Sequence, residues 1–477
     1  MSSYETIIGL EIHSELKTKT KIYCSCKNEF GNEVNSQCCP ICTGMPGTLP
    51  VLNKTVVDYA MKMGLAVNCT INRKSKQDRK NYFYPDLPKA YQVSQFDVPL
   101  CEKGSVEFYS NGEKKTVGIT RIHIEEDAGK LLHDDRFGGS LVDLNRCGVP
   151  LIEIVTEPDI RSAAEAKDFL ETIKSILQYI DVSDCKMQEG SIRCDINVSV
   201  RKPGEPFGTR VEMKNVNSFS AAYRAIEYEA ARQIEVLENG GVISQETRRW
   251  DDAKGENIIL RTKEDAHDYR YFPEPDLCPI IIDDEWYNSI ACQIPELPNE
   301  KMDRYISQMG LSEYEANLLS QNKDRAEYFE ACVKAGASAK ASANWILTDL
   351  GKYMNETNSD FTQVKVTPQM LSELIVLFET KVISSTAAKT VLEKMLADGG
   401  SPKALVEEMG LVQNSNEDEI RVLAQKILDA NPKVVDDYKN GKTNVIGFLV
   451  GQAMRESKGK ANPQILNKLI AEMIGNM

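Results

Sequence analysis

The sequence predicts an α+β protein in three parts: a β-rich cradle domain over residues 1–295, an all-α helical domain over 296–400 and a small α-helical tail domain over 401–477. Segments in which apolar and polar residues alternate, as in half-buried strands, are concentrated before Pro298. From Asn299 onward they give way to short segments with explicit helix caps. Five cysteines crowded between Cys24 and Cys42 predict a metal-stabilised knuckle within the β-rich part.

The composition limits the class of protein. The chain has 477 residues, 42% of them hydrophobic, which suits a folded chain with a sizeable core. Its formal net charge of −14 argues against an indiscriminate polyanion binder, so a nucleic-acid partner would need local basic patches. We find no apolar run of membrane-spanning length and no export leader at Met1–Thr6, and we therefore expect a cytoplasmic protein without a membrane partner.

Two predicted strands share an unusual polar face. In Gly118–Lys130 (GITRIHIEEDAGK) and in Thr6–Leu16 (TIIGLEIHSEL), ionisable residues alternate with isoleucine and leucine. In any single strand such a face is most often simply solvated. Its repetition predicts that ionisable groups from several strands meet on one face of a sheet. These groups are Glu11, His13, Arg121, His123 and Glu125.

Further alternating segments extend the predicted sheet, and amphipathic helices follow them. The strands are Ser140–Arg146, Pro150–Thr156, Ile192–Val200 and Thr209–Lys214, and the helices are Asp159–Ile180 and Ala221–Glu238. Asp195 and Glu212 lie on polar faces of these strands. Glu153 lies within an apolar run, where a carboxylate is unfavourable unless it is paired, metal-bound or at the strand end.

The cysteine-rich segment has metal-site spacing. Cys24 and Cys26 form one pair, and Cys39 and Cys42 form a second pair about a dozen residues later, so four thiolates could surround one tetrahedral Zn²⁺. Four thiolates leave no open position, which predicts a structural site. Cys38 lies beside the second pair, so the choice between Cys38 and Cys39 stays open, as does the alternative of free thiols.

Two stretches are basic. Arg73–Tyr91 mixes cations, Arg79, Lys80 and Lys89 among them, with aromatic residues, which suits phosphates beside a ribose or base. Between residues 439 and 468 there are six basic residues and one acid, Glu456. The basic residues are Lys439, Lys442, Arg455, Lys458, Lys460 and Lys468. For both stretches a solvated surface is an equally good interpretation.

The polar strand faces predict a cation site, because carboxylates suit Mg²⁺, which usually also binds substrate phosphates. A metal-dependent ATP site is therefore one hypothesis, and a structural ion-pair network across the sheet is its competitor. Gly441-Lys442-Thr443 ends like a phosphate-binding loop, but the earlier glycine that this loop requires is Asp436. The sequence also has no amidase-type glycine- and serine-rich loop, so any ammonia that the chain uses must come from elsewhere.

Segments along the whole chain resemble the B subunit of the bacterial aspartyl/glutamyl-tRNA amidotransferases. They are IIGLEIHSELKT, FGNEVNSQCCPICTGMPGTLPVLN, DRKNYFYPDLPKAYQVSQFD, GITRIHIEEDAGK, LVDLNRCGVPLIEIVTEPDIR and DYRYFPEPDL. The resemblance implies a β-rich cradle, a helical domain and a tail domain similar to YqeY-type proteins that reaches the tRNA elbow.

The resemblance also implies a ligase that forms carbon–nitrogen bonds with glutamine as the amido donor. ATP would phosphorylate the side-chain carboxylate of Glu-tRNA(Gln) or Asp-tRNA(Asn), and channelled ammonia would displace the phosphate to give Gln-tRNA(Gln) or Asn-tRNA(Asn). The implied partners are a glutaminase (amidase) subunit, the misacylated tRNA and a small third subunit that completes a heterotrimer. The implied cofactors are ATP, Mg²⁺ and structural Zn²⁺.

Carried over by motif, the implied catalytic residues are Glu11, His13 and Glu125. The implied Mg²⁺ ligands are Glu11, His13, Glu125 and Asp195, with Glu153 as a weaker candidate. Arg79, Lys80 and Lys89 are the candidates for binding the cofactor phosphates, with Lys80 and Lys89 near the phosphates or the tunnel mouth. The implied zinc ligands are Cys24, Cys26, Cys39 and Cys42, and family members that lack them keep the fold, which favours a structural role.

A zinc-stabilised scaffold that presents tRNA to another catalytic chain is the alternative function. The polar strand faces favour the enzyme, whereas the lack of a known ATP fingerprint favours the scaffold. A zinc-dependent hydrolase is disfavoured because four cysteines leave no open metal position. Which of the two misacylated tRNAs is used depends on the synthetases that supply them.

Overall fold

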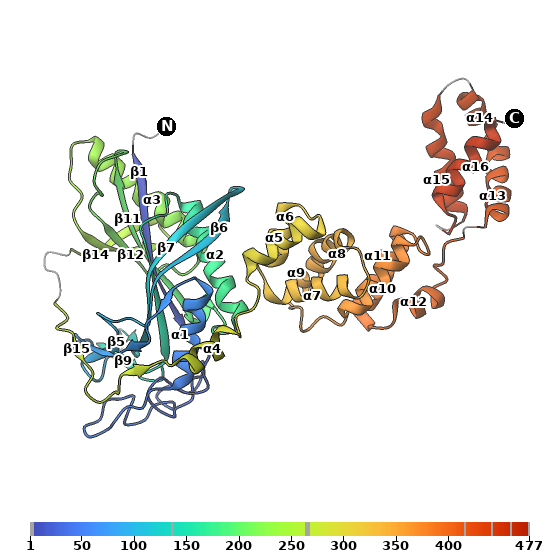
Figure 1. The fold of residues 1–477 in the computed structure, drawn as a ribbon. Coiled ribbons are helices and arrows are strands. Elements are labelled where there is room, and N and C mark those ends of the chain that lie inside the picture. The colour runs from blue at the N-terminus through green and yellow to red at the C-terminus, as the bar shows by residue number, and fades with distance from the viewer. Residues whose placement is uncertain are drawn as a thin grey trace. The chain divides into compact units, whose positions relative to one another are not determined.

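The computed structural model describes residues 4–134, 138–262, 268–414, 416–439, 442–457 and 460–475. The chain divides into two compact units, Met1–Lys301 and Met302–Met477. The first unit combines a large sheet with helices, and the second is helical (Figure 1). The predicted α+β class is therefore confirmed, whereas the predicted boundaries at 295/296 and 400/401 stay predictions.

The first unit is built on a nine-stranded sheet with the order β14-β13-β12-β11-β1-β10-β7-β6-β2. Strands β12 and β13 run parallel, and the other neighbours in this sheet run antiparallel. The strands are β1 (Glu5–Glu15), β2 (Thr70–Ile71), β6 (Cys101–Ser110), β7 (Glu113–Glu126), β10 (Pro150–Thr156), β11 (Ile192–Arg201), β12 (Val211–Lys214), β13 (Glu246–Asp251) and β14 (Glu256–Thr262).

Smaller sheets flank the large one. They join β15 (Phe272–Pro273), β4 (Asp78–Asn81) and β5 (Tyr91–Ser94); β16 (Ile280–Ile281) and β3 (Lys74–Ser75); and β8 (Lys130–Asp134) and β9 (Gly139–Asp143). The predicted strand Ser140–Arg146 is wrong beyond Asp143, because a turn follows in which Cys147 N donates to the Leu144 carbonyl at 3.1 Å. The basic segment Arg73–Tyr91 is part of these small sheets rather than one loop.

Helices pack against one face of the large sheet. They are α1 (Lys54–Ala66), α2 (Ala163–Tyr179) and α3 (Phe219–Glu238), and the short α4 (Asp284–Ala291) contacts α1. Helix α2 begins later than the predicted Asp159, because the Ser162 hydroxyl caps it by accepting from Glu165 N at 3.1 Å.

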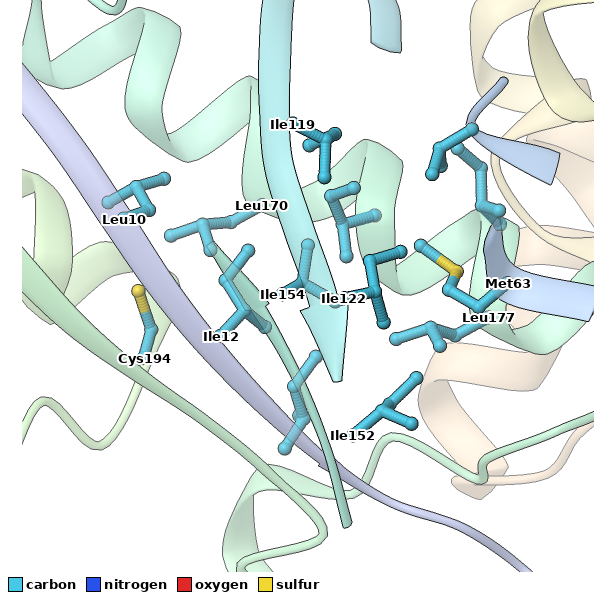
Figure 2. Close-up of a cluster of buried hydrophobic side chains, with 14 of the residues drawn as sticks. Leu10, Ile12, Met63, Ile119, Ile122, Ile152, Ile154, Leu170, Leu177 and Cys194 are labelled. Carbon is cyan, nitrogen blue, oxygen red and sulfur yellow. The ribbon is translucent and has the colours of Figure 1, made fainter. Parts of the chain in front are cut away.

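The core lies between these helices and the apolar face of the strands. Figure 2 shows Ile12, Ile122 and Ile154 from three strands gathered with Leu170 of α2 and Met63 of α1. Because side chains alternate along a strand, burying these isoleucines turns the intervening residues toward the opposite face. The buried apolar face thus positions the polar one.

The chain from Pro298 onward consists of short helices in the part that the structure describes. They are α5 (Pro298–Met309), α6 (Glu313–Ser320), α7 (Lys323–Lys334), α8 (Ala339–Trp345), α9 (Gly351–Thr357), α10 (Pro368–Glu379), α11 (Ser385–Asp398), α12 (Pro402–Glu408), α13 (Glu417–Ala430), α14 (Pro432–Lys439), α15 (Ile446–Glu456) and α16 (Pro463–Gly475). The predicted capping box of Ser312 and Glu315 is present. No helix among the described residues has both the length and the apolar character needed to cross a bilayer.

Truncating a core side chain should destabilise the first unit far more than truncating a matched surface side chain. Leu170 is fully buried, whereas Leu260 is 51% exposed. We expect Leu170→Ala to lower the free energy of unfolding by about 2–5 kcal/mol, because it removes apolar contacts and leaves a cavity. Leu260→Ala should change it by less than about 0.5 kcal/mol. Hydrogen exchange of the first unit's strands measures both changes in the free energy of unfolding. Equal changes for the two variants would contradict the placement of Leu170 in the core.

Candidate active site on the sheet face

The strand register brings the predicted ionisable residues together. Strand β1 lies between β11 and β10, so that Glu11 is opposite Asp195 and His13 is opposite Glu153. On the far side of β10, Glu153 is opposite His123 of β7. Paired residues of neighbouring strands point to the same face, so all these side chains lie on the face opposite the helices.

One cluster of hydrogen-bonding groups forms around His13. Its Nε2 lies 3.3 Å from Glu125 Oε1 and 3.7 Å from Glu153 Oε2. The Nε2 of His123 lies 3.1 Å from Glu153 Oε2 and 3.6 Å from Glu125 Oε2. One ligand atom each from His13, Glu125 and Glu153 lies within 4.8 Å of the others, which is compact enough to hold one cation.

The charges in this cluster balance one another. Burial raises the pKa of Glu125, but hydrogen bonds from His123 and His13 hold that pKa well below its ordinary value. Burial also raises the pKa of Glu153, but the positive charge of His123 outweighs this effect and lowers that pKa to about 2. Burial lowers the pKa of His123, but Glu153 and Glu125 raise it to about 9. A divalent cation would supply the positive charge that protonated imidazoles otherwise supply.

In a second cluster, all the possible cation ligands are carboxylates. Oxygen atoms of Glu11, Asp195 and Glu212 lie within 4.8 Å of one another. Lys214 Nζ lies 2.5 Å from Asp195 Oδ2 and 3.1 Å from Glu212 Oε1, and Asn197 Nδ2 donates to Glu11 Oε1 at 3.0 Å. Such a set of oxygen ligands suits Mg²⁺. The same contacts are equally consistent with a structural ion-pair network that includes Lys214.

The two clusters share one cavity of about 550 Å³. Five basic side chains line it in addition to the acids: Lys80, Arg121, Arg210, Lys214 and Arg261. Aromatic rings form another wall, where Phe96 stacks on Tyr271 with ring centroids 4.3 Å apart. Burial lowers the pKa of Lys80, but nearby Glu125 and other acids raise it, so the ammonium remains charged. The cavity therefore combines carboxylates for cations with cations for phosphates.

The structure brings together most, but not all, of the predicted site residues. Glu11, His13, Lys80, Glu153 and Asp195 line the cavity, and Glu125 bonds to residues that line it. Glu212 also lines it; the sequence predicts Glu212 among the acids of the polar strand faces, although the set carried over by motif leaves it out. The signal was the alternation in TRVEMK, which puts Glu212 on a polar strand face.

Lys89 and Arg79 are absent from the described residues that line this cavity. Lys89 is ion-paired with Glu126 and lines a separate cavity of about 220 Å³. The Arg79 guanidinium donates to both oxygens of Glu274, at 2.6 and 2.7 Å. Their roles in binding phosphate stay predictions.

The cysteine geometry is consistent with a zinc site. The Sγ atoms of Cys24, Cys26, Cys39 and Cys42 lie within 4.8 Å of one another. A tetrahedron with Zn–S bonds of about 2.3 Å has edges of about 3.8 Å, and Cys39 Sγ lies 3.9 Å from Cys42 Sγ. Cys38 Sγ instead donates to the Asn35 carbonyl at 3.2 Å and is outside this group.

The surroundings of Cys42 favour its thiolate. The hydrogen bond with Cys24 outweighs burial and lowers the pKa of Cys42 to about 5. Cys39 N donates to Cys42 Sγ at 3.1 Å, and Lys21 Nζ lies 3.8 Å from the same sulfur. A thiolate is the form that binds metal, so these contacts suit a metal ligand.

Comparisons with known proteins agree with this geometry. A model of the GatB/GatE catalytic domain matches residues 6–288, and a model described as the GatB domain matches residues 327–474. The aspartyl/glutamyl-tRNA(Asn/Gln) amidotransferase B subunit of Caldicellulosiruptor bescii is 59% identical over 473 residues, which cover 98% of each chain. The chain belongs to this family of amidotransferase B subunits. The resemblance inferred from the sequence motifs is therefore confirmed.

Other relatives support the same assignment over the full length. The B subunit of Thermoanaerobacter pseudethanolicus is 57% identical over 470 residues, covering 98% of this chain and 99% of that one. The B subunit of Brevibacillus brevis is 52% identical over 478 residues, covering 100% of both chains. The matched regions thus include both the sheet face with its acids and the helical C-terminal part.

A metal analysis tests the choice of cysteine ligands. We expect about one zinc per chain by elemental mass spectrometry. Cys39→Ser should remove most of it, because three thiolates bind zinc far less tightly than four. Cys38→Ser is the matched control and should keep the metal. Zinc lost from Cys38→Ser and kept by Cys39→Ser would reverse the assignment.

Proposed function

We propose that this chain is the kinase and transamidase subunit of a tRNA-dependent amidotransferase, a ligase that converts Glu-tRNA(Gln) to Gln-tRNA(Gln), Asp-tRNA(Asn) to Asn-tRNA(Asn), or both. The observation that carries the proposal is the single cavity in which two acidic clusters face five basic side chains. That combination suits a carboxylate, a triphosphate and the cations between them. The names of the related subunits support the choice of a tRNA substrate.

The chemistry needs the carboxylate to be activated. Ammonia cannot displace an oxide from a carboxylate, so a carboxylate oxygen first attacks the γ-phosphorus of ATP and ADP leaves. Ammonia then attacks the acyl carbon, phosphate leaves with its oxygen, and the nitrogen loses a proton to form the amide. Phosphoryl transfer of this kind depends chiefly on positioning and on charge stabilisation.

The chain's own residues would do that positioning. Glu11, Asp195 and Glu212 form one candidate cation site, and His13, Glu125 and Glu153 form the other. These residues would hold Mg²⁺, which would supply positive charge to neutralise the phosphates. The basic side chains that line the cavity, Lys80, Arg121 and Arg210 among them, would hold the phosphate oxygens that the cation leaves free.

Ammonia needs a path that excludes water, because water would destroy an acyl phosphate. We assign this role to the cavity beside Lys89, which is lined by Glu126, the residue after Glu125 in β7. Both members of the Lys89–Glu126 ion pair line this cavity, so the proposal places the pair on the ammonia path. This proposal gives Lys89 a place at the tunnel mouth rather than at the phosphates.

The partners in this proposal are a glutaminase, the tRNA and a small third subunit, in the cytoplasm where translation takes place. The tail would contact the tRNA through its exposed basic side chains. Of the predicted basic group, Lys442 lies 2.9 Å from Asp437 and Lys468 lies 3.9 Å from Glu472, so part of their charge is already offset. Lys458 lies outside the described residues.

The scaffold remains a second candidate because one observation favours it. The acids on the sheet face already have partners, as in the pairing of Glu125 and Glu153 with His13 and His123. A self-sufficient ion-pair network needs no substrate. Substitution of Glu125 separates the two functions. A structural network predicts that the variant loses stability, whereas a cation site predicts that it loses amide formation.

Glu125→Gln in the assembled heterotrimer tests the enzymatic role. Supplied with ATP, Mg²⁺, ammonium chloride and misacylated tRNA, the variant should form amide at least about a hundredfold more slowly, because it loses a carboxylate of the candidate site for the cation that neutralises the phosphates. Its affinity for tRNA should stay unchanged. Glu113→Gln, an exposed carboxylate at the other end of the same strand, is the matched control. Normal amide formation by Glu125→Gln would favour the scaffold.

A further inference from the structure

The cysteine knuckle, residues 24–50, forms part of the wall of the cavity beside Lys89. Cys24, Cys42 and Gly44 line this space of about 220 Å³, and so do Lys89 and Glu126. It is the cavity proposed above for the ammonia path. The cysteines and the ion pair therefore share one wall, although four thiolates leave a metal no open position for chemistry of its own.

The backbone of the knuckle lies against Lys89 at Gly44. A Cβ atom on Gly44 would lie 2.4 Å from Cγ of Lys89 and 3.2 Å from its Cα. Both distances are shorter than ordinary van der Waals contact, so Lys89 would have to move. Gly44 also has a φ of +68°, a conformation in which a side chain is strained. Only glycine therefore lets the knuckle approach the stem of Lys89 so closely.

The cysteine loop fixes the position of Gly44. Gly44 N donates to the Ile41 carbonyl at 3.1 Å. Ile41 lies between Cys39 and Cys42, and Cys39 N donates to Cys42 Sγ at 3.1 Å. The buried Lys21 donates to the same sulfur from Nζ at 3.8 Å. Contacts that hold the cysteine sulfurs in place thus also hold Gly44 in place.

The ammonium group of Lys89 is enclosed on its other sides. It is ion-paired with Glu126 and lies 5.7 Å from the centroid of the Tyr23 ring and 5.2 Å from that of Tyr91. Glu126 is 2% exposed and also accepts from Val93 N at 2.9 Å. A buried carboxylate that loses its cation is unfavourable unless water solvates it. Displacing Lys89 would therefore bring water into the cavity.

We propose that the cysteine knuckle positions Lys89 on the ammonia path, with Gly44 as the point of contact. The knuckle holds the lysine on Glu126 and so keeps this wall of the path closed to solvent. In contact with bulk water, ammonia takes up a proton from the solvent, and the resulting ammonium has no lone pair with which to attack the acyl carbon. This inference rests on the proposed function and adds to it a role for the knuckle in coupling glutamine hydrolysis to amide formation.

Gly44→Ala in the assembled heterotrimer tests the inference, because its methyl group displaces Lys89. Amide formation from glutamine should fall at least about tenfold, whereas amide formation from saturating ammonium chloride should change less than about twofold, because ammonia from bulk solvent does not need the path. More glutamine should be hydrolysed for each amide formed. Elemental mass spectrometry should find the zinc content unchanged, which shows that the metal site of the variant is intact.

Gly31→Ala is the matched control. Gly31 belongs to the same knuckle and has a φ of +85°, so that an alanine is strained there as well. A Cβ atom on Gly31 would meet no atom of the described residues within 4 Å. The control variant should therefore keep the ratio of glutamine-dependent to ammonium-dependent amide formation.

A double-mutant cycle with Lys89→Ala shows whether Gly44 acts through Lys89. Lys89→Ala lacks the Cγ atom and should itself uncouple glutamine hydrolysis, so adding Gly44→Ala should lower the glutamine-dependent rate by less than about twofold more. Additive effects would overturn the inference. So would equal losses of glutamine-dependent and ammonium-dependent amide formation in Gly44→Ala, or no loss of either. All three results leave the proposed function standing, because that function fails instead if Glu125→Gln forms amide normally.

Discussion

The alternation of side chains in β1, fixed by the burial of its apolar face, is the constraint on which the site depends. Ile8, Leu10 and Ile12 are fully buried against the helices, so Glu11 and His13 must point to the opposite face. A register slip of one residue would exchange the two sets, burying a carboxylate and an imidazole in the core. The free energy gained from apolar burial therefore also holds the ionisable groups in place.

The central position of β1 turns that constraint into a site. Its neighbours β10 and β11 supply Glu153 and Asp195 opposite its own polar residues, and β7 and β12 extend the same face by one strand on each side. Glu125 and His123 are almost fully buried at this depth. Charges interact more strongly there than at the surface, so acids and bases must balance one another or bind ions.

Local patterns in the sequence predicted which faces are polar, but not how the faces meet. The alternation in TIIGLEIHSEL and in GITRIHIEEDAGK correctly oriented Glu11, His13, His123 and Glu125, since strand periodicity is a local property. The grouping of Glu11 with Glu212, and of His13 with Glu125, depends on pairing between strands that are distant in the chain. Sequence spacing contains no information on that pairing.

The basic residues show the same limit of prediction from sequence. The sequence identified Arg79 and Lys89 as cations near aromatic rings, yet it could not show that Glu274 and Glu126 neutralise them. Glu274 is far away in sequence and reaches Arg79 through the small sheet that joins β15 to β4.

Diffraction at the manganese absorption edge, from crystals of the assembled amidotransferase with Mn²⁺ and a non-hydrolysable ATP analogue, tests the central claim most directly. Mn²⁺ accepts the same oxygen ligands as Mg²⁺, so it reports where the cation binds. The account predicts anomalous peaks within bonding distance of the carboxylates on the face of β1, with the triphosphate beside them. Manganese and nucleotide bound away from this face, with the ion pairs of His13 and His123 intact, would contradict it.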